Sequence, residues 1–519
     1  MRAVEAAAIA GGAVTGLELM ERAGAAVVAA ILAEWPRFAT GPRHAAVLCG
    51  PGNNGGDGFV IARLLRESGW QVSVVFVGEA GRLPPDAAAN YRRWCAQGRV
   101  LAAGELPEDL SLSPLETADL FVDALFGTGL SRPIPGEAQS IFSSLFSAIL
   151  PAPVVAVDIP SGLCADSGRP LVPEGYPGNG WPASDGLACE AQLTVAFHRA
   201  KPGHYLDRGP AYCGKLVVAD IGLPAHSDAV PRRQVAGLAR PLGLGKSGTG
   251  AHKFSYGHAL VLSGPSGHGG AARLSARGAL RAGAGLVTLA CPPEALVENA
   301  ARLDAVMLRV VEDPAALVAL LQDRRINALC LGPGLGLGAR EMGLVEQALR
   351  VRRATALDAD ALTLVAGDLA LRGLLHADCV LTPHAGEFAR LFPDIADRLA
   401  APATRGPAFS RIDAVRAAAA RAGAVVLLKG ADTVIAAPDG EAMVSAAVDD
   451  RCAPWLATAG AGDVLSGFIA GLMAQGARPM QAAGTAAWLH VEAARRFGPG
   501  LIAEDLPEAL PGVFRALGL

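Results

Sequence analysis

The residues best suited to chemistry lie between Thr458 and Gly467, where the chain reads Thr-Ala-Gly-Ala-Gly-Asp-Val-Leu-Ser-Gly. Gly460 and Gly462 allow a tight turn, and apolar residues at helical spacing follow Asp463. A glycine turn that opens a helix offers free N–H groups and a positive dipole end, which suit a phosphate or the charge of a transition state. Asp463 could accept a proton from a substrate hydroxyl. In the alternative, Asp463 is an ordinary helix N-cap.

Four short apolar segments in the C-terminal half are each followed directly by glycine or polar residues. Parallel strands deliver their following loops to one edge of a sheet, so this repetition predicts a doubly wound α/β fold. The residues delivered in this way are Gly332 to Gly336 after strand 328–331, Asp358 and Asp360 after 356–357, His384 and Glu387 after 379–381, and Lys429 after 425–428.

Each of these polar residues also has a structural interpretation. His384 could be a buried core histidine. Asp358 and Asp360 could contact magnesium through water or serve the fold alone. Lys429 could be a surface charge, although its place before Gly430 suits a nucleotide phosphate.

The Gly-Asp turn resembles that of the ribokinase-like enzymes, and further segments are similar to one branch of them, the ADP-dependent NAD(P)H-hydrate dehydratases. Those segments are Gly332–Gly336, Thr382–Phe388 and Leu428–Thr433. The resemblance covers roughly residues 230 to 510. It implies a ribokinase-like doubly wound α/β domain at 226–519, which uses ADP with magnesium and has Asp463 as its base. The implied substrate-binding residues are Ala271, Gly334, His384 and Asp463, and the implied nucleotide-binding residues are Lys429, Gly430, Ala431, Asp432, Thr433 and Gly462.

The N-terminal half contains a predicted βαβ unit around the glycine-rich turn Gly50–Gly58. We expect a strand at 45–49, a helix from Phe59 to Ser68 and a second strand at 72–77, which indicates a parallel sheet. The turn lacks both the Rossmann fingerprint and the lysine of a Walker loop. Its amide oxygens and carboxylate suit sugar hydroxyls or a hard cation. In the alternative, it is an Asn-Gly turn without a ligand.

Two further carboxylates of this half belong to predicted strands. Asp123 lies inside the apolar segment 121–126, where a charge needs a partner or a cation. Gly127–Pro133 follows as a second ligand loop, and Asp158 directly follows the apolar segment 154–157. Three such strand ends at one edge of a sheet together indicate a ligand site.

In this order, the segments resemble the NAD(P)H-hydrate epimerase domain over roughly residues 1 to 225. The resemblance implies a Rossmann-like three-layer α/β domain at 1–225, with Asp158 facing the hydrated nicotinamide ring and handling protons. The family usually has a small residue where His198 stands, so this position departs from the pattern. The implied dinucleotide contacts are Asn53, Asn54, Gly55, Gly56, Asp57, Gly127, Thr128, Gly129, Leu130, Ser131, Arg132, Pro133 and Asp158. The implied potassium ligands are Asn54, Asp123 and Ser161.

The composition limits the remaining possibilities. A chain of 519 residues exceeds one ordinary core, and 51% hydrophobic with 18% charged residues indicates packed globular domains. The net charge of −4 gives no electrostatic basis for binding nucleic acid. Nine scattered cysteines without a CxxC pair favour free thiols in a reducing cytoplasm, and ten histidines without an HExxH pattern disfavour zinc.

We expect no signal peptide, and we interpret the uncharged run 138–157 as a helix, a proline break and a strand instead of a membrane span. Gly245-Lys246-Ser247 lacks the earlier glycine and the strand of a P-loop. Two α/β domains with apolar surface are expected to form a homo-oligomer. Two alternative functions stay open: a sugar or vitamin-precursor kinase fused to another domain, and an N-terminal half that senses dinucleotides without catalysis.

Overall fold

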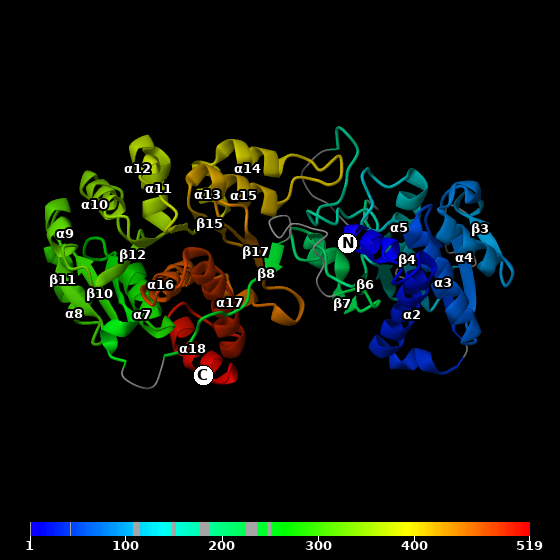
Figure 1. The fold of residues 1–519 in the computed structure, drawn as a ribbon, viewed down its shortest axis with the longest axis horizontal. Coiled ribbons are helices and arrows are strands. Elements are labelled where there is room, and N and C mark those ends of the chain that lie inside the picture. The colour runs from blue at the N-terminus through cyan, green and yellow to red at the C-terminus, as the bar shows by residue number, and fades with distance from the viewer. Residues whose placement is uncertain are drawn as a thin grey trace. The chain divides into compact units, whose positions relative to one another are not determined.

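The computed structural model describes residues 2–41, 43–106, 115–147, 152–176, 187–224, 236–246 and 251–519 of the 519-residue chain (Figure 1). The chain divides into two compact units. Unit 1 consists of Met1–Pro231 and Ala400–Ser410, and unit 2 consists of Arg232–Leu399 and Arg411–Leu519. The domain boundary that the sequence predicts between residues 225 and 226 lies outside the described residues.

Unit 1 is built on a seven-stranded parallel sheet. Its strands are β1 (His44–Cys49), β2 (Gln71–Phe76), β3 (Val100–Ala102), β4 (Leu120–Ala124), β5 (Val154–Val157), β6 (Leu193–Phe197) and β7 (Lys215–Ala219). Their order is β3-β2-β1-β4-β5-β6-β7, so the winding direction reverses between β1 and β4. Open α/β sheets bind ligands at the carboxyl ends of strands beside such a reversal. The Rossmann-like architecture predicted for this half is confirmed.

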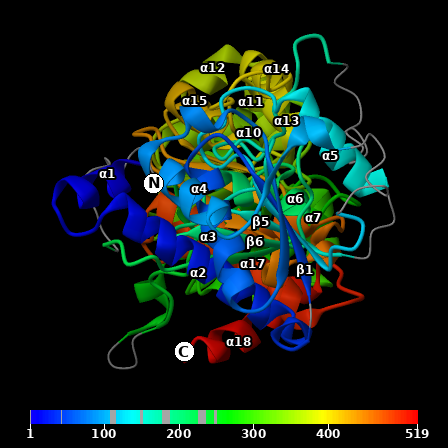
Figure 2. The same cartoon turned by 90° about the vertical axis from the view of Figure 1, so that its right-hand side faces the viewer.

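Helices cover both faces of this sheet, because side chains alternate along each strand. Ala45, Val47 and Cys49 join an apolar cluster with the helices α2 and α3, whereas Ala46 and Leu48 join a second cluster with α5. Figures 1 and 2 show α2, α3 and α4 side by side. The helices of unit 1 are α1 (Arg2–Ala10), α2 (Gly16–Glu34), α3 (Asn53–Glu67), α4 (Pro85–Cys95), α5 (Gly136–Ser147) and α6 (Gly209–Cys213).

The helix after β1 begins earlier than the sequence predicts. α3 starts at Asn53, so most of the glycine-rich segment forms helical turns, and the prediction of a loop reaching to Phe59 was wrong. Glycine weakens helices in general, but here close packing requires it. A Cβ on Gly50 would lie 1.8 Å from the carbonyl oxygen of Leu125, and a Cβ on Gly55 would lie 1.9 Å from that of Gly50.

Unit 2 is built on a ten-stranded sheet. Its strands are β8 (Ala236–Leu238), β9 (His258–Leu262), β10 (Leu286–Cys291), β11 (Met307–Val310), β12 (Ile326–Leu331), β13 (Ala354–Leu357), β14 (Cys379–Leu381), β15 (Val425–Leu428), β16 (Asp432–Ala436) and β17 (Ala442–Ala446). The order is β11-β10-β9-β12-β13-β14-β15-β16-β17-β8. The strands from β11 to β15 are parallel, and β15, β16 and β17 pair antiparallel. The doubly wound sheet predicted for this half is confirmed.

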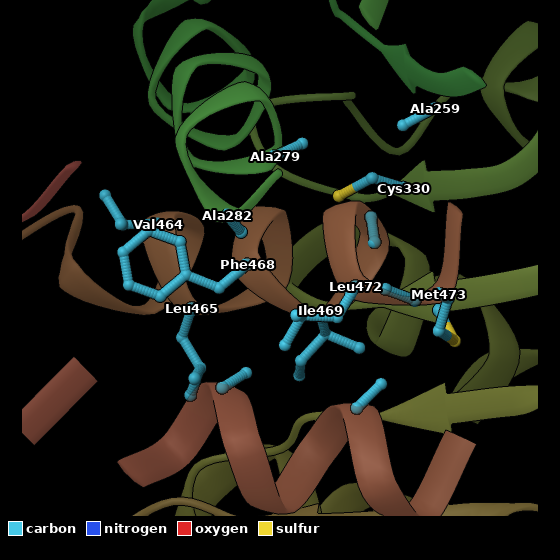
Figure 3. Packing of buried hydrophobic residues seen from close by; sticks show 14 of the residues in the cluster. Ala259, Ala279, Ala282, Cys330, Val464, Leu465, Phe468, Ile469, Leu472 and Met473 are labelled. Atoms are coloured by element: carbon cyan, nitrogen blue, oxygen red, sulfur yellow. The ribbon is translucent and has the colours of Figure 1, made fainter. Parts of the chain in front are cut away.

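Helices α7, α16, α17 and α18 lie on one side of this sheet, and α10 to α15 lie on the other (Figure 1). The helices of unit 2 are α7 (Gly270–Ala282), α8 (Leu296–Ala300), α9 (Pro314–Leu320), α10 (Ala339–Arg350), α11 (Ala359–Gly367), α12 (Leu369–Gly373), α13 (Ala385–Leu391), α14 (Pro393–Ala400), α15 (Arg411–Ala422), α16 (Ala461–Ala474), α17 (Pro479–Phe497) and α18 (Asp505–Ala516). The main core lies between α7, α16, α17 and the sheet; Figure 3 shows Phe468 and Ile469 of α16 among the buried side chains.

The contact between α7 and α16 is unusually close because glycine lies at the crossing. A Cβ on Gly467 would lie 2.2 Å from the carbonyl oxygen of Ser275, and a Cβ on Gly471 would lie 2.4 Å from that of Ala279. These two glycines are four residues apart, so they share one face of α16. The crossing therefore fixes the start of α16, which carries Asp463, against α7 and the core.

No helix among the described residues is both long and apolar enough to cross a bilayer. The run 138–157 contains the end of α5 and the whole of β5, as predicted, and its residues 148–151 lie outside the described part.

Candidate active sites

In unit 2, the glycine turn opens α16 as the sequence predicts. Gly460 is the N-cap and has a left-handed backbone with φ of 86°, which favours glycine. Asp463 is the third residue of the helix. The alternative in which Asp463 is the N-cap is therefore wrong, and its carboxylate is free for another role. The N–H groups of the first helical turn remain available for an anion.

Buried hydrogen bonds hold this turn in place. His490 of α17 lies 2.9 Å, through Nε2, from the carbonyl oxygen of Ala461, and burial lowers the pKa of His490 to about 4. The neutral imidazole therefore donates this bond at neutral pH. The hydroxyls of Ser275 and Ser466 both donate to the carbonyl oxygen of Asp463, each at 2.8 Å. The bonds from Ser275 and His490 were not predicted from the sequence, because they join α16 to other helices, whereas the bond from Ser466 lies within α16.

Asp463 faces a cluster of charges delivered by three strand ends. Lys429 Nζ lies 2.7 Å from Asp358 Oδ1 and 3.8 Å from Glu387 Oε2. A Cβ on Gly462 would lie 3.3 Å from Lys429 Nζ, which places the glycine turn against this lysine. Burial, and then the charge of Asp358, raise the pKa of Asp463 to about 7, although Lys429 opposes the shift. A carboxylate with such a pKa is well matched to a general base near neutral pH.

With Asp463 as the general base that the resemblance implies, this pKa predicts how the rate of the reaction in unit 2 depends on pH. Asp463 accepts a proton only when it is ionised, so protonation below about pH 7 removes the base and lowers kcat/KM. We expect kcat/KM to fall by about tenfold per pH unit below about pH 6.5 and to level off above about pH 8. The measurement is the initial rate at low substrate across this range. A rate that stays constant down to the ordinary pH range of carboxyl titration would contradict the role of Asp463.

The residues implied for substrate binding in unit 2 lie on separate elements. Ala271 and Gly334 lie together, since a Cβ on Gly334 would come 3.4 Å from the Cβ of Ala271. His384 is the N-cap of α13, and its Nδ1 accepts from the N–H of Gly386 at 3.0 Å. Its side chain is 56% exposed, so the core-histidine alternative is wrong. Glu387 completes a capping box through the N–H of His384 at 2.8 Å.

The segment implied for nucleotide binding forms a compact turn between β15 and β16. Thr433 Oγ1 accepts from the N–H of Gly430 at 3.1 Å and donates to its carbonyl oxygen at 2.7 Å. Arg411 Nε lies 3.2 Å from Asp432 Oδ2, so Asp432 supports the turn, and Ala431 accepts from the N–H of Ala447 at 2.7 Å. Gly430 itself stays exposed. The role of Arg411 was missed, because it lies on α15, before the motif.

Asp358 and Asp360 both have protein partners. Asp358 pairs with Lys429, and Asp360 Oδ2 accepts from the N–H of Gly336 at 2.8 Å. The Gly332–Gly336 turn is thereby tied to the first turn of α11. Among the described residues, no group of three or more histidine, cysteine or acidic side chains is arranged to hold a metal.

In unit 1, Asp123 is fully buried and its carboxylate is surrounded by donors. Ser161 Oγ donates to Asp123 Oδ1 at 2.6 Å, and the N–H of Ser161 donates to Oδ2 at 2.7 Å. The N–H of Leu125 donates to Oδ1 at 3.2 Å. Burial nevertheless raises the pKa of Asp123, which is the expected effect of removing a charge from water. A cation nearby would offset that cost.

Asn54 lies beside these residues. A Cβ on Gly127 would lie 3.0 Å from Asn54 Oδ1, and the N–H of Phe126 donates to Ser161 Oγ at 2.8 Å. The Nδ2 of Asn54 is buried without a hydrogen-bond partner in the described part of the chain. The amide, hydroxyl, carboxylate and carbonyl oxygens gathered here are the ligand types that hard cations accept, so the residues fit potassium.

Asp158 lies at the carboxyl end of β5 with a left-handed backbone, φ 69°, which is rare for a residue other than glycine. Lys201 Nζ forms a buried ion pair with its Oδ1. His204 Nε2 lies 2.9 Å from the carbonyl oxygen of Asp158. His198 also has a positive φ of 60°, so it occupies a position that suits a small residue such as glycine. No role for Lys201 or His204 was predicted from the sequence.

The residues implied to hold the dinucleotide belong to two segments of unit 1. Asn53 to Asp57 form the start of α3, after β1, and Gly127 to Pro133 follow β4. Because β1 and β4 are parallel neighbours, both segments lie at one edge of the sheet. The second segment is supported by Gly406 of the same unit, whose N–H donates to the carbonyl oxygen of Ser131 at 3.1 Å.

The first unit has a Rossmann-like parallel sheet, and the second has a mixed doubly wound sheet with an acidic residue at a glycine turn. Together they place the chain in the class of two-domain α/β enzymes. Two family models match: "YjeF-related protein N-terminus" at residues 16–203 and "NAD(P)H-hydrate dehydratase" at 259–509. Bifunctional NAD(P)H-hydrate repair enzymes of Moorella thermoacetica and Coxiella burnetii are each 36% identical to the chain. The alignments cover 97% and 98% of this chain, and 93% and 96% of the two relatives, respectively. The chain belongs to the family of bifunctional NAD(P)H-hydrate repair enzymes.

Relatives also match the halves separately. The NAD(P)H-hydrate epimerase of Rhodobacter capsulatus is 49% identical over 43% of this chain and 96% of its own. A solved structure of the ADP/ATP-dependent NAD(P)H-hydrate dehydratase from Bacillus subtilis covers 55% of this chain and 95% of its own, with 26% identity and a TM-score of 0.44.

Proposed function

We propose that this chain repairs hydrated NADH and NADPH in two steps. Unit 1 interconverts the R and S hydrates, and unit 2 removes water from the S hydrate at the expense of ADP. The observation that carries the proposal is the placement of Asp463, with its raised pKa, at the glycine turn of α16 beside Lys429. The identity of the substrates is inferred from the family to which the chain belongs.

Dehydration in unit 2 follows from this placement. Asp463 takes the proton of the ring hydroxyl, and the resulting oxygen attacks the terminal phosphorus of ADP, which releases AMP. The N–H groups of the α16 turn stabilise the charge of the transferring group. Loss of phosphate with a proton from the adjacent ring carbon then restores the dihydropyridine, because phosphate leaves far more easily than hydroxide. Magnesium that arrives with ADP neutralises phosphate charge when it is bound.

The remaining residues of unit 2 orient the two substrates in this proposal. Ala271, Gly334 and His384 contact the hydrated dinucleotide. Lys429 approaches the phosphates of ADP, and the exposed turn between β15 and β16, together with Thr433, contacts its ribose or phosphates. The partners of Lys429 in the cluster, Asp358 and Glu387, keep its ammonium directed toward Gly462.

The stoichiometry of the reaction tests this function. Purified S hydrate with ADP and magnesium should yield NADH, AMP and orthophosphate in equal amounts, measured by absorbance and chromatography. Accumulation of a phosphorylated product without return of the dihydropyridine would instead identify the kinase alternative. Parallel assays with ATP decide which nucleotide is the better phosphoryl donor.

We propose that potassium binds to Asn54, Asp123 and Ser161 of unit 1. Replacing Asp123 with Ala removes a carboxylate and should lower the rate of epimerisation by about tenfold or more, with loss of any stimulation by potassium. The measurement is epimer exchange in potassium, sodium and choline salts. Dehydration of the S hydrate by the same variant serves as the control and should be unchanged. An epimerisation rate that still responds to potassium would contradict the site.

We also propose that the chain acts in the cytoplasm as a homo-oligomer. Light scattering of the purified protein measures its assembly. For unit 1, a sensing function without catalysis predicts that dinucleotides bind while the two epimers do not exchange.

A further inference from the structure

Two carboxyl groups of unit 1 have opposite surroundings. Asp158 forms a buried ion pair with Lys201 Nζ, which also lies 3.3 Å from the carbonyl oxygen of Phe197. Asp57 is half-buried, and its side chain has no hydrogen bond or ion pair within the described residues. A buried cation compensates the charge of the carboxylate beside it, whereas a carboxyl group buried without a partner favours its neutral form.

The surroundings of Asp158 are fixed by His204. The N–H of Lys201 donates to His204 Nδ1 at 2.9 Å, so the ring proton lies on Nε2, which donates to the carbonyl oxygen of Asp158 at 2.9 Å. Burial lowers the pKa of His204 to about 4, so the ring is neutral at physiological pH. His204 therefore clamps the strained backbone of Asp158, and Lys201 supplies the positive charge.

Asp57 lies near the start of α3, after β1, while Asp158 lies at the end of β5. β4 separates β1 from β5, so the ends of these two strands are about 10 Å apart. Asp57 and Asp158 therefore follow strands on either side of β4 at the carboxyl edge of the sheet, where one ring can lie between their side chains. Burial raises the pKa of Asp57 well above its usual range, and the charges of Asp158 and Glu5 raise it further.

We propose that Asp57 and Asp158 are the acid and the base of epimerisation, and that Lys201 is the positioning residue that gives Asp158 the base role. The proposal rests on the epimerase function proposed for unit 1. It gives Asp57 a chemical role where the family resemblance implied a dinucleotide contact alone.

The proton count of the reaction balances with these two groups. Neutral Asp57 protonates the ring hydroxyl, the C–O bond breaks, and water leaves as the lone pair of the ring nitrogen forms an iminium ion. Water adds to the other face of the same carbon while the Asp158 carboxylate takes its extra proton. The cycle leaves Asp57 ionised and Asp158 protonated, which is the state required for the reverse conversion, and exchange with solvent restores the first state.

The first test separates catalysis from binding. Replacing Asp57 with Asn keeps a polar side chain of the same size and should lower kcat for epimer exchange by about 100-fold, with KM changed by less than about threefold. The incorporation of ¹⁸O from labelled water into the hydrate should fall equally. Asp86→Asn, at the start of α4 of the same unit, is the matched control and should keep the full rate.

The second test examines the charge of Lys201. Lys201→Ala should lower kcat by about 100-fold, and added propylammonium, which replaces the missing part of the side chain, should restore it by at least about tenfold. Neutral 1-butanol should restore nothing. Lys215→Ala, which removes a partly exposed lysine paired with Glu34, should have no effect. Circular dichroism shows whether each variant is folded. Lys201→Arg keeps the positive charge, so it tests the same role if Lys201→Ala does not fold. Lys201→Arg should retain more epimerase activity than Lys201→Ala.

The outcomes distinguish the two proposals. Absence of epimer exchange by the unaltered chain would refute the epimerase function itself. If the unaltered chain exchanges epimers and Asp57→Asn exchanges them as fast, Asp57 is not the acid. If 1-butanol restores Lys201→Ala as well as propylammonium does, Lys201 acts through packing, and the positioning role is overturned.

Discussion

Asp463→Asn is expected to lower kcat for dehydration by about 1,000-fold, which is about 4 kcal/mol of transition-state stabilisation. Asparagine keeps the size of the side chain and can still form hydrogen bonds, but it cannot accept the hydroxyl proton. The backbone should not move, because the carbonyl oxygen of residue 463 keeps its bonds from Ser275 and Ser466. The measurement is a single-turnover rate with the S hydrate, ADP and magnesium.

The epimerase activity of the same variant is the control for this prediction. Epimer exchange depends on unit 1, so it should be unchanged, and this excludes general unfolding as the cause. Dehydration within about tenfold of the unaltered rate would show that another group removes the proton.

Stability provides an independent check on this base. The pKa of Asp463 is raised to about 7 in the folded chain, so the folded state binds its proton more tightly than the unfolded state does. The stabilisation from that proton is complete below the ordinary carboxyl pKa and is lost as pH rises toward about 7. Asparagine does not ionise, so Asp463→Asn removes the loss of stability that ionisation of Asp463 causes. The Tm of the variant should therefore exceed that of the unaltered chain by an amount that grows up to about pH 7 and then stays constant.

Gly467→Val is expected to destabilise unit 2 by about 1–3 kcal/mol, the usual cost of overpacking. A Cβ at this position would lie 2.2 Å from the carbonyl oxygen of Ser275 and 2.7 Å from its Cα, so α7 and α16 would have to separate. Ser275 also holds the backbone of Asp463, so dehydration should fall with stability. The measurements are the urea unfolding midpoint and kcat.

The matched control is Gly367→Val. Gly367 also lies in a helix, α11, but a Cβ there would meet no atom within 4 Å. Both variants replace a helical glycine with valine, but only Gly467→Val would bring the new side chain against α7, so a larger loss of stability in Gly467→Val reports that contact. Equal stability of the two variants would show that the close approach of α7 and α16 contributes nothing.

The sequence predicted most of the fold because buried parallel strands are short apolar runs with clear ends. The observed bounds of β5, β14 and β15 are those expected, whereas the order of the strands in each sheet was not predicted. The start of α3 was wrong, because helix propensity treats each glycine as a breaker. Helix propensity takes no account of the carbonyl oxygens of Leu125 and Gly50, which leave no room for a Cβ on Gly50 and Gly55 respectively.

The candidate site residues were likewise predicted where a local sequence pattern marks them and missed where only tertiary contacts do. Asp463 was found because it follows a glycine turn that opens a helix, and Asp123 and Asp158 were found because one interrupts and the other follows an apolar strand. His490, Arg411 and Lys201 were not, because the residues that they contact lie far from them in the chain and no motif surrounds them. The environments of Asp57 and Asp158 also depend on tertiary contacts, so the sequence could not separate an acid from a base.

The central claim is that one chain returns both hydrates to the active coenzyme. The most direct measurement starts from a mixture of both NADH-hydrate epimers with ADP and magnesium and follows the absorbance of the dihydronicotinamide. Complete recovery at a rate above that of spontaneous epimerisation, and no recovery without nucleotide, is the predicted result. Recovery that stops once the S hydrate is consumed would contradict catalysis in unit 1. Absence of recovery with either ADP or ATP would contradict the account of unit 2.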